Sequence, residues 1–134
     1  MEVRTQPQLT AEEIRAELGQ VMAWLTDWGF ASVEVVYGFG CEESDCQWKA
    51  VSVATGDLAT YLDRAERTGF FKYGNADVWI GAGAARFRLC HEADIHFASP
   101  HHESVETFKS QWLANGWTVY QGTGEPGCEW TKFP

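Results

Sequence analysis

The chain has 134 residues, enough for one domain with a substantial core, and its formal net charge is −9. This acidity argues against binding to a nucleic-acid backbone, which needs a basic surface. No apolar run approaches the roughly 18 residues that cross a membrane, and the opening MEVRTQPQLT lacks the apolar stretch of a signal peptide. We therefore expect one cytoplasmic domain over residues 1–134, with no membrane partner.

The first residues, 1–8, are expected to form a flexible lead into a helix. Thr10-Ala-Glu-Glu13 is a capping box, and Gly29 suits the position just beyond a helix end. The apolar residues between them recur at helical spacing and form one packing stripe: Ile14, Leu18, Val21, Leu25 and Trp28.

Two strands with a polar connection are predicted next. Residues 32–39 alternate as a strand, with Val33, Val35, Tyr37 and Phe39 on one face, and residues 47–54 return. The loop between them carries three carboxylates, on Glu42, Glu43 and Asp45. It lacks the length and central glycine of an EF-hand loop. It is either an exposed tip made polar for solubility or an acidic contact for a cationic partner.

A second helix is predicted to open at residues 55–56 and to end at Gly69. Three rings follow it, on Phe70, Phe71 and Tyr73. Three exposed rings in one connector would be unusual. They either cover the edge of the core or form a contact patch.

The segment Asp77–Ser99, DVWIGAGAARFRLCHEADIHFAS, is predicted to be a β-hairpin with a long second arm, turning at the small residues 81–84. Alternation places Phe87, Leu89, His91, Ala93, Ile95 and Phe97 inward. It places Arg86, Arg88, Cys90, Glu92, Asp94, His96 and Ala98 outward.

The outward row brings metal-ligand types together on Cys90, Glu92, Asp94 and His96, with neighbours about 6.5–7 Å apart. His101, at the start of the next helix, is the histidine best placed to join His96. No HxH, HExxH or paired CxxC accompanies them. A solvated strand face, with its arginines paired to carboxylates, is the favoured interpretation.

A third helix is predicted to start with Ser99 as N-cap and Pro100 at its first position, and to end at residues 115–116. A strand at 117–121 follows, with 128–133 as a further edge strand. The order α-β-β-α-β-β-α-β-(β) predicts an α+β fold. We expect a mostly antiparallel sheet of five to six strands, with three helices packed mainly on one face.

Catalytic motifs are absent from the sequence: there is no Walker A, GxSxG or HExxH. On a strand, Cys90 and His91 would point to opposite faces, which rules out a nucleophile–base pair. Cys41 and Cys46 flank one loop, but without a secretion signal we expect reduced thiols. The prediction is therefore no enzyme, no catalytic residues, no metal and no cofactor.

In its compact size, acidity, aromatic content and lack of catalytic motifs, the chain resembles the small bacterial immunity proteins that neutralise polymorphic or contact-dependent toxins. Its most distinctive segment, CHEADIHF at residues 90–97, is not assigned to a particular immunity family. The resemblance implies binding to a cognate toxin, often a basic nuclease, and occlusion of its active site. The expected partner-binding residues are Glu42, Glu43, Asp45, Phe70, Phe71, Tyr73, Glu92, Asp94 and His96.

Two alternatives stay open. The first is a small metal-dependent hydrolase or isomerase that uses Glu92, Asp94 and His96 together with His101. The second is a regulatory adaptor domain that binds a different protein through the same acidic, aromatic surface. The oligomeric state is not indicated by the sequence.

Overall fold

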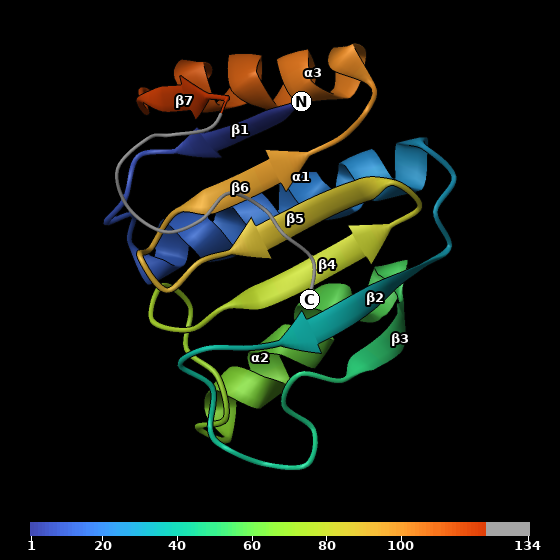
Figure 1. Ribbon diagram of the computed structural model, residues 1–134, viewed down its shortest axis with the longest axis vertical. Coiled ribbons are helices and arrows are strands. Elements are labelled where there is room, and N and C mark those ends of the chain that lie inside the picture. The colour runs from blue at the N-terminus through green and yellow to red at the C-terminus, as the bar shows by residue number, and fades with distance from the viewer. Residues whose placement is uncertain (123–134) are drawn as a thin grey trace.

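The computed structural model describes residues 1–122, so the predicted strand at 128–133 lies outside the described residues. Within residues 1–122, seven strands form one sheet, and three helices lie behind it in Figure 1, all on the same face. The strand order is β3-β2-β4-β5-β6-β1-β7, and all neighbouring strands are antiparallel. The predicted α+β class is confirmed, with more strands than the five to six expected.

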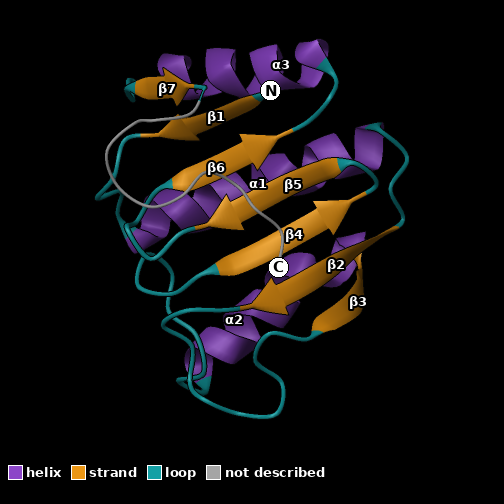
Figure 2. Cartoon of the chain, viewed as in Figure 1, coloured by secondary structure: helices purple, strands orange, loops and turns teal. Residues whose placement is uncertain are grey.

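Figure 2 distinguishes the sheet from the helices behind it. The strands are β1 (Glu2–Thr5), β2 (Ser32–Tyr37), β3 (Ala50–Ala54), β4 (Val78–Ala82), β5 (Ala85–Leu89), β6 (Ile95–Ala98) and β7 (Val119–Gln121). The helices are α1 (Ala11–Asp27), α2 (Leu58–Arg67) and α3 (His102–Ala114), with a 3₁₀ turn, η1 (Thr55–Asp57), before α2. Among the helices of residues 1–122, none has both the length and the apolar character needed to cross a membrane.

Helix α1 begins and ends as its sequence predicts. The Glu13 N–H donates to Thr10 Oγ1 at 3.1 Å, and the Thr10 N–H donates to Glu13 Oε1 at 3.0 Å. Gly29 follows the helix with a φ of 82°, a conformation that glycine adopts without steric cost. The capping box and the glycine stop are therefore confirmed.

The expected flexible lead is wrong for residues 2–5, which form strand β1 between β6 and β7. Arg4 lies opposite His96 on one side and Tyr120 on the other. Four residues are too few to show a clear alternation. Both partner strands are also remote in the sequence, so no local pattern indicates the pairing.

The predicted long second arm is also wrong, because the chain turns between β5 and β6. The Cys90 N–H donates to the Asp94 carbonyl at 3.0 Å, and the Ala93 N–H donates to the Cys90 carbonyl at 3.0 Å. Ala93 has a φ of 59°, at the position where three-residue hairpin loops usually carry glycine. An alanine there gives no turn signal, so the sequence reads as one continuous strand.

Helix α3 starts two residues later than predicted. His101 occupies the N-cap position, and Ser99 Oγ accepts the His101 N–H at 3.0 Å. The predicted end is confirmed, because Asn115 is the C-cap and Gly116 follows with a φ of 85°.

The core between sheet and helices is rich in aromatic rings. Phe108 of α3 packs against Phe97 and Phe87, with ring centroids 4.7 and 5.3 Å apart. Phe71 and Tyr73 are buried at another part of this core, with exposed fractions of 1% and 4%. Of the two interpretations of the connector rings, covering the core is therefore correct for these two.

Candidate functional site

The sheet face opposite the helices is polar, and we call it the polar face. Strand register places alternate residues of each strand on it, in rows that cross the sheet. One row consists of Val36, Trp79, Arg88, His96, Arg4 and Tyr120.

Asp77, just before β4, organises one end of this face. Its Oδ2 accepts a hydrogen bond from Arg88 Nη2 at 3.0 Å, and its Oδ1 accepts the His91 N–H at 2.8 Å. The His91 ring adds a contact of 2.9 Å from Nδ1 to Oδ1. Arg88 also lies over the Trp79 ring, at 5.0 Å from its centroid. Asp77 is only 2% exposed, and its two carboxylate oxygens are paired with the buried Arg88 and the partly exposed His91.

The loop between β2 and β3 is anchored at the same end of the sheet. Its backbone is tied to the rest of the fold by several hydrogen bonds. The Asp77 N–H donates to the Phe39 carbonyl at 2.7 Å, and the Glu42 N–H donates to the Phe70 carbonyl at 2.9 Å. The Trp48 N–H donates to the Tyr37 carbonyl at 2.7 Å. The loop therefore displays its side chains from a fixed backbone.

These displayed side chains combine negative charge with large rings. The three predicted carboxylates are exposed, and so are Phe39 at 60% and Trp48 at 53%. The Phe39 ring contacts the His91 ring with centroids 4.8 Å apart, and Trp48 packs on Trp79 at 5.9 Å. We call this surface the acidic–aromatic loop: Phe39, Glu42, Glu43, Asp45 and Trp48.

Gly38 makes room for the packing of the two tryptophans. A Cβ at this position would lie 2.3 Å from an atom of the Trp79 ring and 2.8 Å from the Trp48 ring. Trp48 itself has a φ of 66°, a conformation that non-glycine residues rarely adopt. The backbone strain at Trp48 therefore accompanies the packing of its ring on Trp79.

Several predicted contact residues are not on the surface. Phe71, Tyr73, Asp94 and His96 are buried, so the prediction that they contact a partner is wrong. Phe70 is partly buried and packs against Tyr37, with centroids 5.0 Å apart.

Glu92 is exposed in the β5–β6 turn and lies beside the acidic–aromatic loop. His91 lies between Glu92 and that loop. Glu92 Oε1 lies 3.5 Å from His91 Nε2, and the His91 ring contacts Phe39. Of the second predicted patch, Glu92 alone therefore remains at the surface.

Phe39 and Trp48 were not predicted as contact residues, because both were expected to lie within strands. The strands end at Tyr37 and begin at Ala50, which leaves both rings in the loop. The dense polar tract between them is the signal that could have shortened the predicted strands.

The β5–β6 turn also assembles a buried cluster of three side chains: Cys90, Asp94 and His96. One ligand atom from each lies within 4.8 Å of the other two. His96 Nε2 is 3.0 Å from Asp94 Oδ2. Burial by itself raises the pKa of Asp94, but the hydrogen bond and charge of His96, the Cys90 thiol and Arg4 together lower it.

The metal-ligand set considered in the sequence is assembled only in part: Cys90, Asp94 and His96 converge, whereas Glu92 and His101 do not join them. Glu92 points to solvent, and the His101 ring packs on Trp28 beside the helices, with centroids 5.3 Å apart. Because His96 lies on the polar face, His101 does not join it.

The expectation that Cys90 and His91 point to opposite faces is also wrong. Both belong to a turn, and the Cys90 sulfur is 3.8 Å from His91 Nδ1. The thiol is fully buried, however, which keeps it from a substrate in solution. Cys41 and Cys46 form no disulfide within residues 1–122, and burial raises the pKa of Cys41 to about 11.

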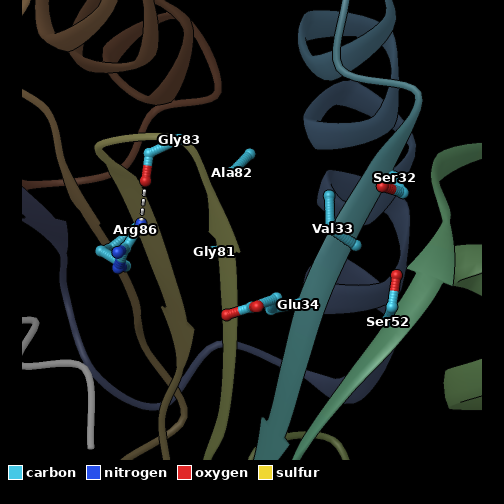
Figure 3. A pocket seen from close by; sticks show the side chains of 8 residues that line it. All are labelled: Ser32, Val33, Glu34, Ser52, Gly81, Ala82, Gly83 and Arg86. Atoms are coloured by element: carbon cyan, nitrogen blue, oxygen red, sulfur yellow. Dashed lines mark hydrogen bonds between the residues drawn. The ribbon is translucent and has the colours of Figure 1, made fainter.

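A shallow pocket of about 320 Å³ opens near the β4–β5 turn, at the other end of these strands (Figure 3). Glu34 and Arg86 stand on either side of Gly81, which follows from the strand register. Arg86 Nη1 donates to the Gly83 and Ala85 carbonyls.

Two features therefore distinguish the end of the sheet where β2 and β5 terminate. One is the exposed acidic–aromatic loop, and the other is the buried cluster of Cys90, Asp94 and His96. Comparisons with protein-family models, curated proteins and solved structures found no match to this chain.

Proposed function

We propose that this protein is an immunity protein that binds a cationic toxin through the acidic–aromatic loop and occludes its active site. One observation carries the proposal. Three exposed carboxylates and two exposed rings occupy a single loop whose backbone is fixed by hydrogen bonds.

The two kinds of side chain have different roles in binding. Carboxylates on an acidic protein attract a basic partner over long range and speed association. A few aromatic residues near the centre of an interface typically supply most of the affinity. Phe39 and Trp48 fit this second role, in place of the ring trio that the sequence indicated. A fixed loop also loses little conformational entropy on binding.

A basic nuclease is the toxin class that fits this surface best. Such an enzyme grips phosphates with cationic side chains, and Glu42, Glu43 and Asp45 present comparable negative charge within four positions. Glu92 lies beyond Phe39 and His91 and adds a fourth carboxylate to the same end of the protein.

Charge reversal tests the electrostatic part of the proposal. The partner is first identified by co-purification from the native host and then produced separately. Replacing Glu42, Glu43 and Asp45 together by lysine should slow association by about 10- to 100-fold at low salt. The matched control, lysine at the exposed residues Asp27, Asp57 and Glu103, changes the net charge equally. Equal slowing by both triple variants would mean that general charge, not the loop, attracts the partner.

Ring removal tests the contact itself. Trp48→Ala should raise Kd by about 30-fold or more, because central aromatic residues contribute roughly 2 kcal/mol or more. Leu113→Ala on α3, which removes another exposed apolar side chain, should leave Kd unchanged. If Trp48→Ala still binds tightly, the loop is not part of the interface.

Enzyme inhibition separates an immunity protein from an adaptor. Nuclease activity of the partner should disappear at one equivalent of this protein. Binding with full retention of that activity would favour the adaptor alternative, which uses the same surface for a different outcome.

A further inference from the structure

We propose that Cys90, Asp94 and His96 bind one divalent transition-metal ion, with zinc as the expected occupant. This site is independent of the acidic–aromatic loop and of the proposed function. A thiolate, a carboxylate and an imidazole are all established zinc ligands. The thiolate favours zinc over magnesium or calcium, which prefer oxygen donors.

The local fold explains why these three side chains meet. Cys90 and Asp94 close the β5–β6 turn through the bond from the Cys90 N–H to the Asp94 carbonyl, so their side chains leave the backbone close together. His96 lies in β6, two residues beyond Asp94, and its Nε2 is 3.0 Å from Asp94 Oδ2. The three ligand atoms lie within 4.8 Å of one another. Tetrahedral zinc, with bonds of about 2.0–2.3 Å, needs separations of roughly 3.3–3.8 Å, so only a small contraction is required.

Burial supports the assignment. Cys90 and His96 have no exposed surface, and Asp94 is 2% exposed. Asp94 Oδ2 contacts His96, but Asp94 Oδ1 is buried without a hydrogen-bond partner in the described part of the chain. A buried carboxylate oxygen without a hydrogen-bond partner lowers the stability of the fold, and coordination to a cation would give this oxygen a partner.

The surrounding charges are compatible with a divalent ion. An ionised Cys90 and Asp94 supply two negative charges for the ion's two positive charges. Arg4, opposite His96 in the register, opposes the binding of a cation. Arg88, opposite His96 on the other side, is paired with Asp77 at 3.0 Å, which reduces its repulsion.

A neighbouring group provides the sharpest control. Asp77, Cys90 and His91 also lie within ligand distance of one another. Both Asp77 oxygens, however, already accept hydrogen bonds from Arg88 and from the His91 N–H. His91 is therefore a matched histidine that should not be needed for metal binding.

The experiment uses the full chain, reduced and freed of metal with a chelator. Calorimetry with Zn²⁺ should give one ion per chain, and Co²⁺ should produce a thiolate-to-cobalt charge-transfer band. Cys90→Ser and His96→Gln should each lower zinc affinity by about 100-fold or more, because even outer-sphere changes cost 10- to 100-fold. Cys46→Ser and His91→Gln should leave affinity and spectrum unchanged.

Three results would overturn the site: no stoichiometric zinc binding by the unaltered chain, a cobalt band that survives Cys90→Ser, or equal losses from His91→Gln and His96→Gln. Circular dichroism identifies any variant that fails to fold. If His96→Gln unfolds, the Cys90→Ser result decides. If both unfold, the unaltered chain decides: zinc should raise its Tm and a chelator should reverse the rise, and no shift would overturn the site.

Discussion

On the helix-covered face of the sheet, Phe87, Phe97 and Phe108 pack ring against ring, whereas on the polar face Arg88 and Asp77 pack charge against charge. Both arrangements are buried. Ring packing gains stability from apolar area and tolerates changes in detail. A buried ion pair gains little net stability, but loses much when one partner is removed. The comparison indicates that one face supplies stability and the other fixes geometry beside the exposed loop.

The largest expected effect is at the ring cluster. Phe108→Ala should lower the free energy of unfolding by about 4 kcal/mol, because it removes a side chain that is 1% exposed and leaves a cavity. Urea denaturation measures the change. A loss below about 1 kcal/mol would show that the rings do not carry the stability of this face.

Asp77→Ala should cost about 3 kcal/mol, since it removes the carboxylate that Arg88 and His91 share. The control is Glu106→Ala on α3, which breaks an exposed contact of 3.8 Å with His102 and should cost at most about 0.5 kcal/mol. If Asp77→Ala and Glu106→Ala lose the same free energy of unfolding in urea, the buried ion pair matters no more than a surface contact.

Glu17 places a carboxylate inside the helix side of the molecule and gives a pH test. Burial raises its pKa, although hydrogen bonds from Trp112 and Asn115 partly oppose this. The folded state therefore favours the protonated acid. The free-energy cost of ionising the buried Glu17 carboxyl is absent below its ordinary pKa of 4.5 and complete above its raised pKa. The free energy of unfolding therefore falls as pH rises between these two values.

Glu17→Gln should accordingly raise stability at pH 7 by up to about 1 kcal/mol and flatten its pH dependence above pH 4.5. Denaturation midpoints across this range, compared with those of the unaltered chain, measure the effect. An unchanged slope would assign the pH dependence to other groups.

The smallest expected effect is at the turn below the buried cluster. Ala93→Gly should stabilise the protein by about 0.5 kcal/mol, because glycine takes the φ of 59° without strain. Ala84→Gly, in the β4–β5 turn, lacks this relief because Ala84 does not have a positive φ, and should destabilise slightly. Thermal melts compare the two. A gain from both variants would mean that turn strain is not the cause.

Local patterns predicted much of this fold, and non-local pairings account for most of what they missed. The capping box at Thr10 and the glycine after α1 act within a few residues, so the sequence alone reveals them. Strand β1 exists because of partners far along the chain. The β5–β6 turn depends on Ala93 accepting a conformation that the residue type does not favour. Neither follows from periodicity.

The candidate site divides in the same way. Glu42, Glu43 and Asp45 were predicted because a dense run of carboxylates is visible in the sequence. Phe39 and Trp48 were not, since rings beside a strand are indistinguishable from rings within it until the strand ends are known. Cys90, Asp94 and His96 were grouped in one row by alternation, but that row included Glu92 and continued through the turn that separates Cys90 from Asp94.

Strand β1 has a consequence for biosynthesis. It is translated long before its partner, since the Ile95 N–H that bonds to Thr5 Oγ1 is 90 residues later. Until β6 has been translated, β1 has no strand to join, and β7 cannot attach to the sheet without β1. Closure of this half of the sheet must therefore wait for nearly the whole described chain, which leaves unpaired strand edges exposed during translation.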